Sequence, residues 1–233
     1  MKYLSIVLTA FLFIGCSSTR IFVPQDFWNQ TNLKIGIAAS SLPEAGAFKQ
    51  GSQGLLDVAI NSAMSSSLED HLQTIDVQDF YKIKNIFKDR LIEKGFTNVK
   101  IVDMSVTFDS LPVSKGKRGK KYSIRDLSMV KDKYDLDYLI LFDIKKHGTL
   151  REYYGFIPLG SPQALFMVNG MLINLADNEY FWLIKMEEEE SIKEVVGEWD
   201  EEPDYPNLTK TIKEAMISSQ EFLEKYFFEK KEE

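Results

Sequence analysis

Short runs of apolar residues predict the strands of this chain. The run YLILF at 138–142 is continuously apolar, so we expect a central strand that is buried on both faces. Residues 33–38, which a loop rich in Ser, Gly and Pro follows, and residues 99–102 also have strand character. Two further runs, at 164–175 and 180–186, are joined by the segment ADNE and predict a β-hairpin.

Apolar residues at three- and four-residue spacing predict helices between these strands. The helical intervals are 54–64, 77–94 and 124–133. The second interval is bounded by residues that favour helix ends, because Asp76 is suited to cap the N-terminus and Gly95 stands where a C-terminal cap is expected. The sequence therefore alternates strands and helices over its first two thirds.

The chain closes with its most regular helical pattern. An apolar stripe runs from Leu208 to Tyr226 behind Asn207, the expected N-cap, and such a stripe is typical of core packing rather than of a cofactor site. The element order is β-α-α-β-α-β, then β-β, then α. This order predicts one mixed α/β (α+β) domain over residues 33–229, with helices packed on a mixed sheet, and a charged tail at 230–233.

The first residues have the layout of an export signal. Lys2 supplies a positive n-region and residues 4–14 an apolar h-region, which together predict a signal peptide over residues 1–15. The apolar run is too short for a transmembrane helix. The segment LFIGC that ends at Cys16 resembles the lipobox of bacterial lipoproteins, in which the cysteine after the cut is acylated, although Phe13 stands where Leu is usual.

Cys16 is the only cysteine in 233 residues, so an exported domain offers it no disulfide partner. A free reactive thiol is the alternative. Its position at the end of the apolar run favours lipidation, and more than one acyl chain gives a stable membrane anchor. We therefore expect a lipid-anchored protein with a tether over residues 16–32. Ser17, in place of an inner-membrane retention Asp, favours the outer membrane facing the periplasm, by resemblance to the enterobacterial sorting rule.

Two segments carry a resemblance to periplasmic lipoproteins with a mixed α/β domain. They are DYLILFDI, which contains the continuous apolar strand, and the hairpin with DNEYFW near its turn. The chain resembles the group that includes the amino-terminal domain of the translocation protein TolB, the lipoprotein activators of peptidoglycan synthases and the periplasmic domain of the curli secretion lipoprotein. The resemblance spans about residues 33–228 and carries over no functional residue except Cys16.

Composition and charge exclude several functions. Removal of residues 1–15 leaves 27 basic and 35 acidic residues, a net charge of −8, which argues against nucleic-acid binding. Hydrophobic residues make up 44% of the chain, enough for the core of one domain. Because zinc-motif, EF-hand and phosphate-loop spacings are all absent, we predict no metal and no cofactor. The acidic groups at 187–190 and 200–204 are interpreted as solvated strand ends rather than calcium ligands.

The two histidines do not predict a site. His71 follows Glu69 and Asp70, and we expect it at the surface. His147 has the same strand parity as Asp143, but four residues of extended chain separate them by about 13 Å, too far for a direct pair.

The segment 115–121, called the basic loop below, concentrates positive charge on an acidic protein. Its cations are Lys115, Lys117, Arg118, Lys120 and Lys121. They suit anionic lipid head groups, lipopolysaccharide phosphates or an acidic partner, and the alternative is a flexible solvated loop.

The segment REYYGFIPLGSPQA at 151–164 places large apolar side chains among turn-forming residues. These side chains are Tyr153, Tyr154, Phe156, Ile157 and Leu159. We interpret the segment as a surface connection. It either folds back over the sheet or presents an apolar patch, which would mark a contact with a partner or with a membrane.

These observations favour a non-catalytic adaptor or accessory subunit of an envelope assembly, with an envelope protein as partner. The oligomeric state is not predicted. An envelope glycan hydrolase is the alternative, and a cleft holding two carboxylates about 5 to 10 Å apart would favour it. A secretion-pore component ranks third, because the 151–164 segment lacks the alternating stretches of roughly 10 residues that membrane strands require.

Overall fold

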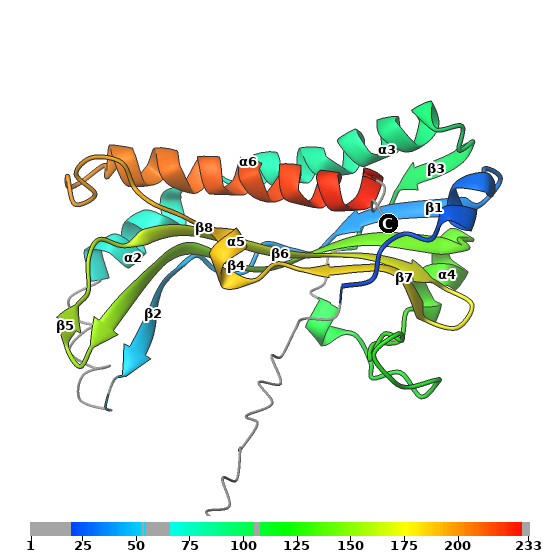
Figure 1. The fold of residues 1–233 in the computed structure, drawn as a ribbon, viewed down its shortest axis with the longest axis horizontal. Coiled ribbons are helices and arrows are strands. Elements are labelled where there is room, and N and C mark those ends of the chain that lie inside the picture. Colours follow the sequence, from blue (N-terminus) through cyan, green and yellow to red (C-terminus); the bar gives the residue numbers. More distant parts are fainter. Residues whose placement is uncertain (1–19, 53, 55–65, 105–107, 230–233) are drawn as a thin grey trace, which may run out of the picture.

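The computed structural model describes residues 20–52, 54, 66–104 and 108–229 (Figure 1). The predicted signal peptide, Cys16, the charged tail and all of the predicted 54–64 helix except Gly54 lie outside these residues. In the part of the chain that is described, no helix has the length and apolar character needed to cross a bilayer.

One mixed sheet forms the centre of a single α/β domain, as predicted. Its main order is β3-β1-β4-β6-β7, while β2 and β5 also pair with β4, and β8 pairs with β6. The pairs β1–β3, β1–β4 and β2–β4 are parallel and the others are antiparallel. The strands are β1 Lys34–Ala39, β2 Gly46–Ser52, β3 Asn98–Ile101, β4 Tyr138–Tyr154, β5 Ile157–Pro158, β6 Gln163–Asn174, β7 Glu179–Lys185 and β8 Ile192–Lys193.

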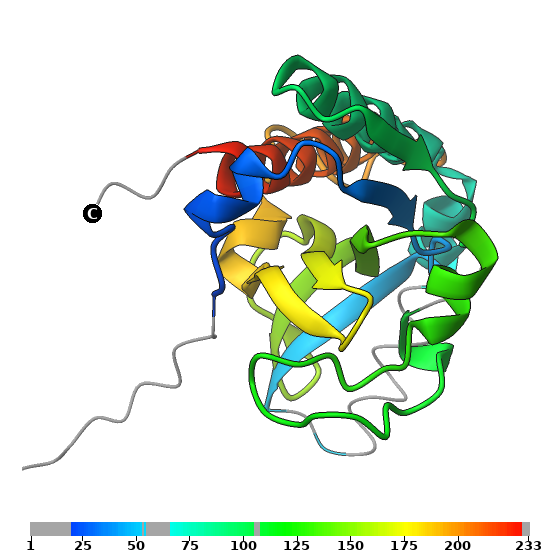
Figure 2. The same ribbon diagram turned by 90° about the vertical axis from the view of Figure 1, so that its right-hand side faces the viewer.

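Helices cover both faces of this sheet. The helices α3 and α6 lie on one face, and α4 lies on the other (Figures 1 and 2). The bounds are η1 Gln25–Asn29, α2 Ser66–Thr74, η2 Gln78–Lys82, α3 Ile83–Glu93, η3 Phe108–Ser110, α4 Ser128–Tyr134, α5 Glu188–Ser191 and α6 Pro206–Phe228. The predicted C-terminal helix and β6–β7 hairpin are thereby confirmed.

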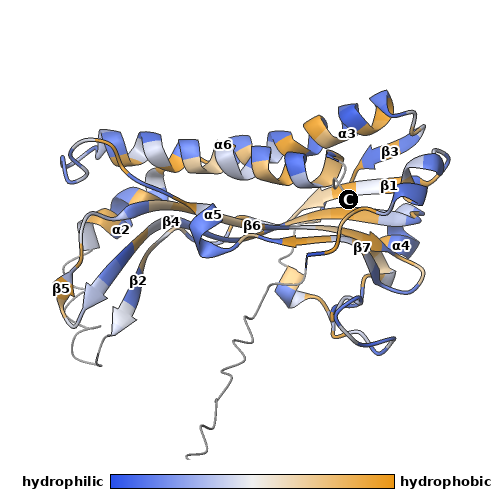
Figure 3. Ribbon diagram, in the orientation of Figure 1, coloured by the Kyte–Doolittle hydropathy of each residue, from blue (hydrophilic) through white to orange (hydrophobic). Residues whose placement is uncertain are grey.

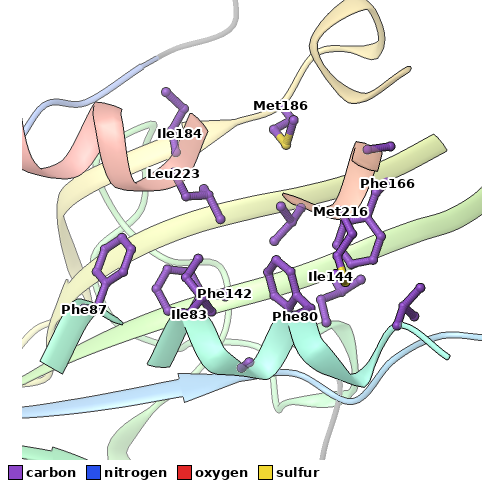
Figure 4. Close-up of a cluster of buried hydrophobic side chains, with 14 of the residues drawn as sticks. Phe80, Ile83, Phe87, Phe142, Ile144, Phe166, Ile184, Met186, Met216 and Leu223 are labelled. Carbon is purple, nitrogen blue, oxygen red and sulfur yellow. The ribbon is translucent and has the colours of Figure 1, made fainter. Parts of the chain in front are cut away.

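Two hydrophobic cores follow from this arrangement. The larger core lies under α3 and α6, where Figure 4 shows aromatic and aliphatic side chains from both helices meeting those of the sheet. The smaller core lies on the α4 face. Alternate residues of β4 serve each core, with Ile140 and Phe142 in the first and Leu139 and Leu141 in the second, so this strand is buried on both faces as predicted. Apolar residues of the long helix α6 belong to the larger core, and Figure 3 shows apolar and polar segments alternating along this helix.

Some of the helix caps predicted from the sequence are present in the structure. Gly95 adopts φ +95°, and its amide and that of Phe96 donate to the last carbonyls of α3, which forms the expected C-terminal cap. Asp76 Oδ1 accepts from the Gln78 amide at 2.8 Å, at the start of η2. The cap predicted at Asn207 is wrong: α6 begins at Pro206, one residue before the predicted cap, so Asn207 lies in the first turn of the helix and its side chain donates to Glu198 O.

Three expected boundaries differ from the structure. The loop expected after β1 contains β2, which pairs with β4 along its whole length. The strand expected at 138–142 continues to Tyr154, so residues 151–154 are strand rather than connection. The helix expected at 124–133 begins only at Ser128, because the preceding residues form local side-chain and backbone hydrogen bonds around Ser123.

Residues 20–32, which the sequence assigned to a tether, pack on the domain. Ile21 exchanges two backbone hydrogen bonds with Leu183 of β7, each 2.9 Å. The Phe27 side chain is fully buried, and the Trp28 ring lies edge-on to Phe227 with the centroids 5.6 Å apart. The packed fold therefore includes these residues.

Candidate functional site

A groove of about 280 Å³ lies at the end of the sheet where β2, β4 and β5 meet; we call it the tip groove. The strands β2 and β4 form one side, and α2 and the segment before α6 form the other. Its lining includes Phe48, Lys49, Ser67, Arg151, Tyr153, Phe156, Trp199, Asp200, Glu202 and Tyr205. Aromatic rings and charged groups thus share one concave surface.

Close approach of two backbones builds this end of the sheet. Gly148 of β4 is paired with Gly46 of β2 and has φ +128°. A Cβ at Gly148 would overlap Gly46 O and lie 2.8 Å from Gly46 N. Glycine at this position therefore lets β2 lie beside β4, and β2 supplies Phe48 and Lys49 to the groove.

Four of the five predicted apolar contact residues are exposed beside the groove. They form the apolar tip: Tyr154 (70% exposed), Phe156 (57%), Ile157 (52%) and Leu159 (53%). Tyr153 is instead buried, at 9% exposure, and lines the groove. Tyr153 thus folds back over the sheet, whereas the other four side chains form an exposed apolar patch.

Arg151 contributes a cation to the groove, and no sequence pattern indicated this role. Its Nε donates to Gly160 O at 2.8 Å. Its guanidinium carbon lies 4.9 Å from the centroid of the Trp199 ring and 5.9 Å from that of Tyr153. Arg151 forms no ion pair with any described residue, so aromatic rings rather than a carboxylate position its guanidinium.

Two carboxylates also line the groove. Ser67 Oγ donates to Glu202 Oε1 at 3.2 Å and lies 3.2 Å from the Tyr205 hydroxyl. Asp200 lines the groove from the same segment. Asp200 and Glu202 therefore border a cavity, whereas the sequence suggested a solvated strand end.

A second cavity, also about 280 Å³, lies against the α4 face of the sheet; we call it the sheet pocket. It contains a chain of charged groups. Asp143 Oδ2 and Asp109 Oδ2 each lie 2.6 Å from Lys145 Nζ, and Arg125 Nη2 lies 3.7 Å from Asp109 Oδ1. Asp143 is 2% exposed, so one end of this chain is inside the protein.

Burial and pairing shift the pKa values of this network in opposite directions. Burial raises the pKa of Asp143 above its usual range, and Lys145 only partly opposes this effect. A hydrogen bond from Lys145 holds the pKa of Asp109 below its usual range. Burial would lower the pKa of Lys145, but its hydrogen bonds to Asp109 and Asp143 outweigh burial and raise it.

Lys145→Met should destabilise the fold by about 3 kcal/mol, because it leaves the buried Asp143 carboxylate unpaired. The deficit should shrink as the pH falls. The parent protein then loses the stability that Asp109 contributes through its depressed pKa, while protonation of Asp143, whose pKa is raised, relieves the variant. Urea unfolding at several pH values measures both effects.

The matched control for this variant is Lys131→Met, which removes an exposed lysine of α4 and should change stability by less than about 0.5 kcal/mol. If the two variants had equal stability, Lys145 would not be the charge that compensates Asp143.

All five cations of the basic loop are exposed, and the loop borders the sheet pocket. Lys120 lines the pocket, and Lys117 Nζ lies 3.0 Å from Asp177 Oδ2 in the β6–β7 turn. Tyr122, just after the loop, forms a bridge with Glu179. The structure therefore holds the loop against the sheet and brings its cations to the mouth of a cavity.

The histidines lie apart from both cavities' charged groups. Asp143 lies on the α4 face of the sheet, whereas His147 packs near Phe166 in the larger core on the other face. A bulge at Lys145 separates the two residues. The prediction that both side chains point to the same face of the strand is therefore wrong. His147 Nε2 lies 2.8 Å from Pro43 O, and burial lowers the pKa of its imidazole. His71, expected at the surface, is half-buried with Nε2 2.7 Å from Thr209 Oγ1.

Comparisons with known proteins add little. No protein-family model matches the chain, and no curated protein matches it. Among solved structures, the hypothetical protein CT253 from Chlamydia trachomatis aligns at 8% identity and a TM-score of 0.26, over 81% of this chain and 98% of that one. A likeness at this score supports no inference about fold or function, so the function is argued from the two cavities and the apolar tip.

Proposed function

We propose that this protein is a lipid-anchored component of the bacterial cell envelope that acts by binding a partner protein rather than by catalysis. The anchor is Cys16, at the outer membrane facing the periplasm. The observation that carries the binding proposal is the apolar tip, where four large side chains within six residues are each more than half exposed. Large exposed apolar patches on soluble domains mark sites that interact with other proteins or with membranes.

The tip groove defines the chemistry of the partner. A segment that covers Phe156 and Ile157 must be apolar, and Arg151 between its aromatic rings lacks an ion-pair partner among the described residues. An arginine of this kind favours a carboxylate, which it can bind through two parallel hydrogen bonds. The partner segment therefore combines an apolar side chain with an acidic one.

Photo-crosslinking in intact cells tests this proposal. A photoreactive amino acid at Phe156, and separately at Leu159, should capture the same protein. The same residue at Ile92, an apolar side chain of α3 that is 50% exposed, should not capture it. The captured protein, once purified, should bind the purified chain, and Arg151→Gln should weaken that binding about tenfold, the effect of one lost charged hydrogen bond.

Two results would contradict the proposal. One is capture of phospholipid rather than protein at Phe156, which would make the apolar tip a membrane contact. The other is a captured protein whose purified form binds the Arg151→Gln variant as tightly as the parent chain, which would remove the tip groove from the interface.

A glycan hydrolase remains the second candidate, because Asp200 and Glu202 both line the tip groove. Glycosidases use two carboxylates about 5 to 10 Å apart, one on each side of the scissile bond. Release of soluble fragments from peptidoglycan by the purified protein, abolished by Glu202→Gln, would replace the binding proposal with this one.

A further inference from the structure

The base of the basic loop carries exposed apolar side chains. Val113 forms a bridge with Arg125, so the two ends of the loop lie side by side and the cations of residues 115–121 lie between them. Val113 and Ile124 are 63% and 65% exposed, and Met129, in the first turn of α4, is 66% exposed. The loop and its base therefore combine apolar side chains with a concentration of positive charge.

The charge of this loop is opposite to that of the protein as a whole. The mature chain has a net charge of 27 − 35 = −8. Among the described residues, Lys117 is the one cation of the loop that forms an ion pair, with Asp177. An anionic surface therefore attracts the protein at this loop and repels much of the rest, which favours one orientation.

The beginning of the described chain and the end of the loop lie on one strand edge. β7 is the last strand of the main sheet order, and Leu183 exchanges two backbone hydrogen bonds with Ile21 on its outer edge. The Tyr180 amide of the same strand donates to Lys121 O at 2.8 Å. These two attachment points are three residues apart, about 10 Å along the strand.

This shared edge places the loop near the expected lipid anchor. Cys16 precedes Ile21 by five residues, which span at most about 18 Å even when fully extended. The end of the basic loop at Lys121 is therefore held within about 30 Å of an acylated Cys16. A contact that is weak by itself becomes effective at this range, because the anchor keeps the bilayer at a high local concentration.

We propose that the basic loop, with Val113, Ile124 and Met129, docks on the surface of an anionic phospholipid bilayer and thereby sets the orientation of the domain on the membrane. We call this surface the docking face. The inference rests on the lipid anchor of the proposed function, which supplies the bilayer at short range. The Lys and Arg side chains meet lipid phosphates, and the apolar side chains enter the interface between head groups and acyl chains.

A bilayer explains more of this surface than an acidic protein does. An acidic protein would also pair with the cations, but it would not account for their position on the strand edge that holds the anchored end of the chain. The docking face also leaves the apolar tip free. In Figure 1, β5 of the apolar tip lies at one end of the long axis, and the loop that precedes α4 lies toward the other.

Vesicle flotation of the mature chain that carries Cys16→Ser tests the docking face without the covalent anchor. Vesicles of phosphatidylcholine that contain phosphatidylglycerol are compared with vesicles of phosphatidylcholine alone. Each cation near an anionic surface strengthens binding about fivefold, so the anionic vesicles should bind about tenfold more tightly or better. This preference should weaken as salt is added, because salt screens exposed charges.

Two variants with the same net charge locate the contact. The first replaces three exposed cations of the loop: Lys115→Gln, Arg118→Gln and Lys121→Gln. The second replaces three exposed lysines of η2 and α6, on the other face of the sheet: Lys82→Gln, Lys210→Gln and Lys213→Gln. The loop variant should lose about tenfold or more in affinity for the anionic vesicles, and the control variant should lose far less.

A single fluorescent label tests the apolar part of the docking face. Cys16 is the only cysteine of the chain, so the Cys16→Ser background accepts one label at a chosen position. A polarity-sensitive fluorophore on Ile124→Cys should shift its emission to the blue when anionic vesicles are added. The same label on Ile217→Cys, at an exposed position of α6, should show no shift.

Equal binding to the two vesicle types, equal affinities of the loop variant and its control, or a blue shift at position 217 and not at 124 would each overturn the proposal. A photoreactive amino acid at Ile124 in intact cells should capture phospholipid. Capture of a protein instead would make the loop a contact for an acidic partner. Failure of the anchor is seen separately, as an absence of fatty-acid labelling at Cys16, and would not alter the flotation of the chain that carries Cys16→Ser.

Discussion

Gly148→Ala is expected to destabilise the protein by about 3 kcal/mol or more, the sum of left-handed backbone strain and an overlap with β2. The added methyl group would overlap Gly46 O, which is backbone and cannot rotate away. Relief requires β2 to separate from β4, and this movement opens the tip groove on the side that Phe48 and Lys49 form. Urea unfolding measures the loss of stability.

Gly119→Ala is the matched control for this change. Gly119 has φ +123°, close to the +128° of Gly148, but a Cβ there would meet nothing within 4 Å. The control should therefore show only the strain of the left-handed conformation, about 1 kcal/mol. If both variants lost the same stability, the close approach of β2 and β4 would not be the reason for glycine at position 148.

Gly170→Ala should lower the free energy of unfolding by about 3 kcal/mol, because the added methyl group would overlap the buried ring of Trp182. Gly170 lies on β6, and a Cβ there would also lie 2.8 Å from Leu223 Cδ2 of α6. The Trp182 ring is fully buried with Phe87 and Phe227 as aromatic neighbours, so it has little space to move. Thermal or urea unfolding of the variant measures the cost.

A second substitution tests the cause. Trp182→Phe alone leaves a void and should cost about 2 kcal/mol. Its indole Nε1 has no hydrogen-bond partner among the described residues, so phenylalanine loses none. In the double variant the smaller ring makes room for the methyl group at position 170. The loss of stability of the double variant should therefore be smaller than the sum of the two single losses by about 1 kcal/mol or more. Simple additivity would show that the methyl group and the ring do not compete for one space.

The central strands could be predicted because burial on both faces leaves a continuous apolar run. Residues 138–142 are such a run, and each of these residues is buried. The rest of β4 could not be predicted in this way, since residues 143–154 mix charged, small and aromatic side chains. Their strand conformation depends on pairing with β6 and with β2, and β2 is distant in the sequence.

The candidate sites could likewise be predicted only where the local sequence shows them. The apolar tip was visible because large apolar side chains stood among turn-forming residues, and the exposure of Tyr154 and Phe156 agrees with that pattern. The role of Arg151 was not visible, because it depends on Trp199, which is far away in the chain. The role of Asp143 was not visible either, because the local sequence does not show that its carboxylate is buried. The bulge at Lys145 also reverses which face of the sheet the following side chains of β4 point to. A strand pattern without interruptions does not predict this reversal.

The strand β4 joins the two sites directly. Asp143 lines the sheet pocket and Tyr153 lines the tip groove, and these two residues are ten positions apart, about 30 Å along one strand. A pull applied between the two cavities would act along this strand, against its antiparallel ladder with β6. The hydrogen bonds of that ladder lie across the direction of force and are loaded in shear together, rather than opened one at a time. The ladder as a whole therefore resists stretching of the strand that links the two cavities.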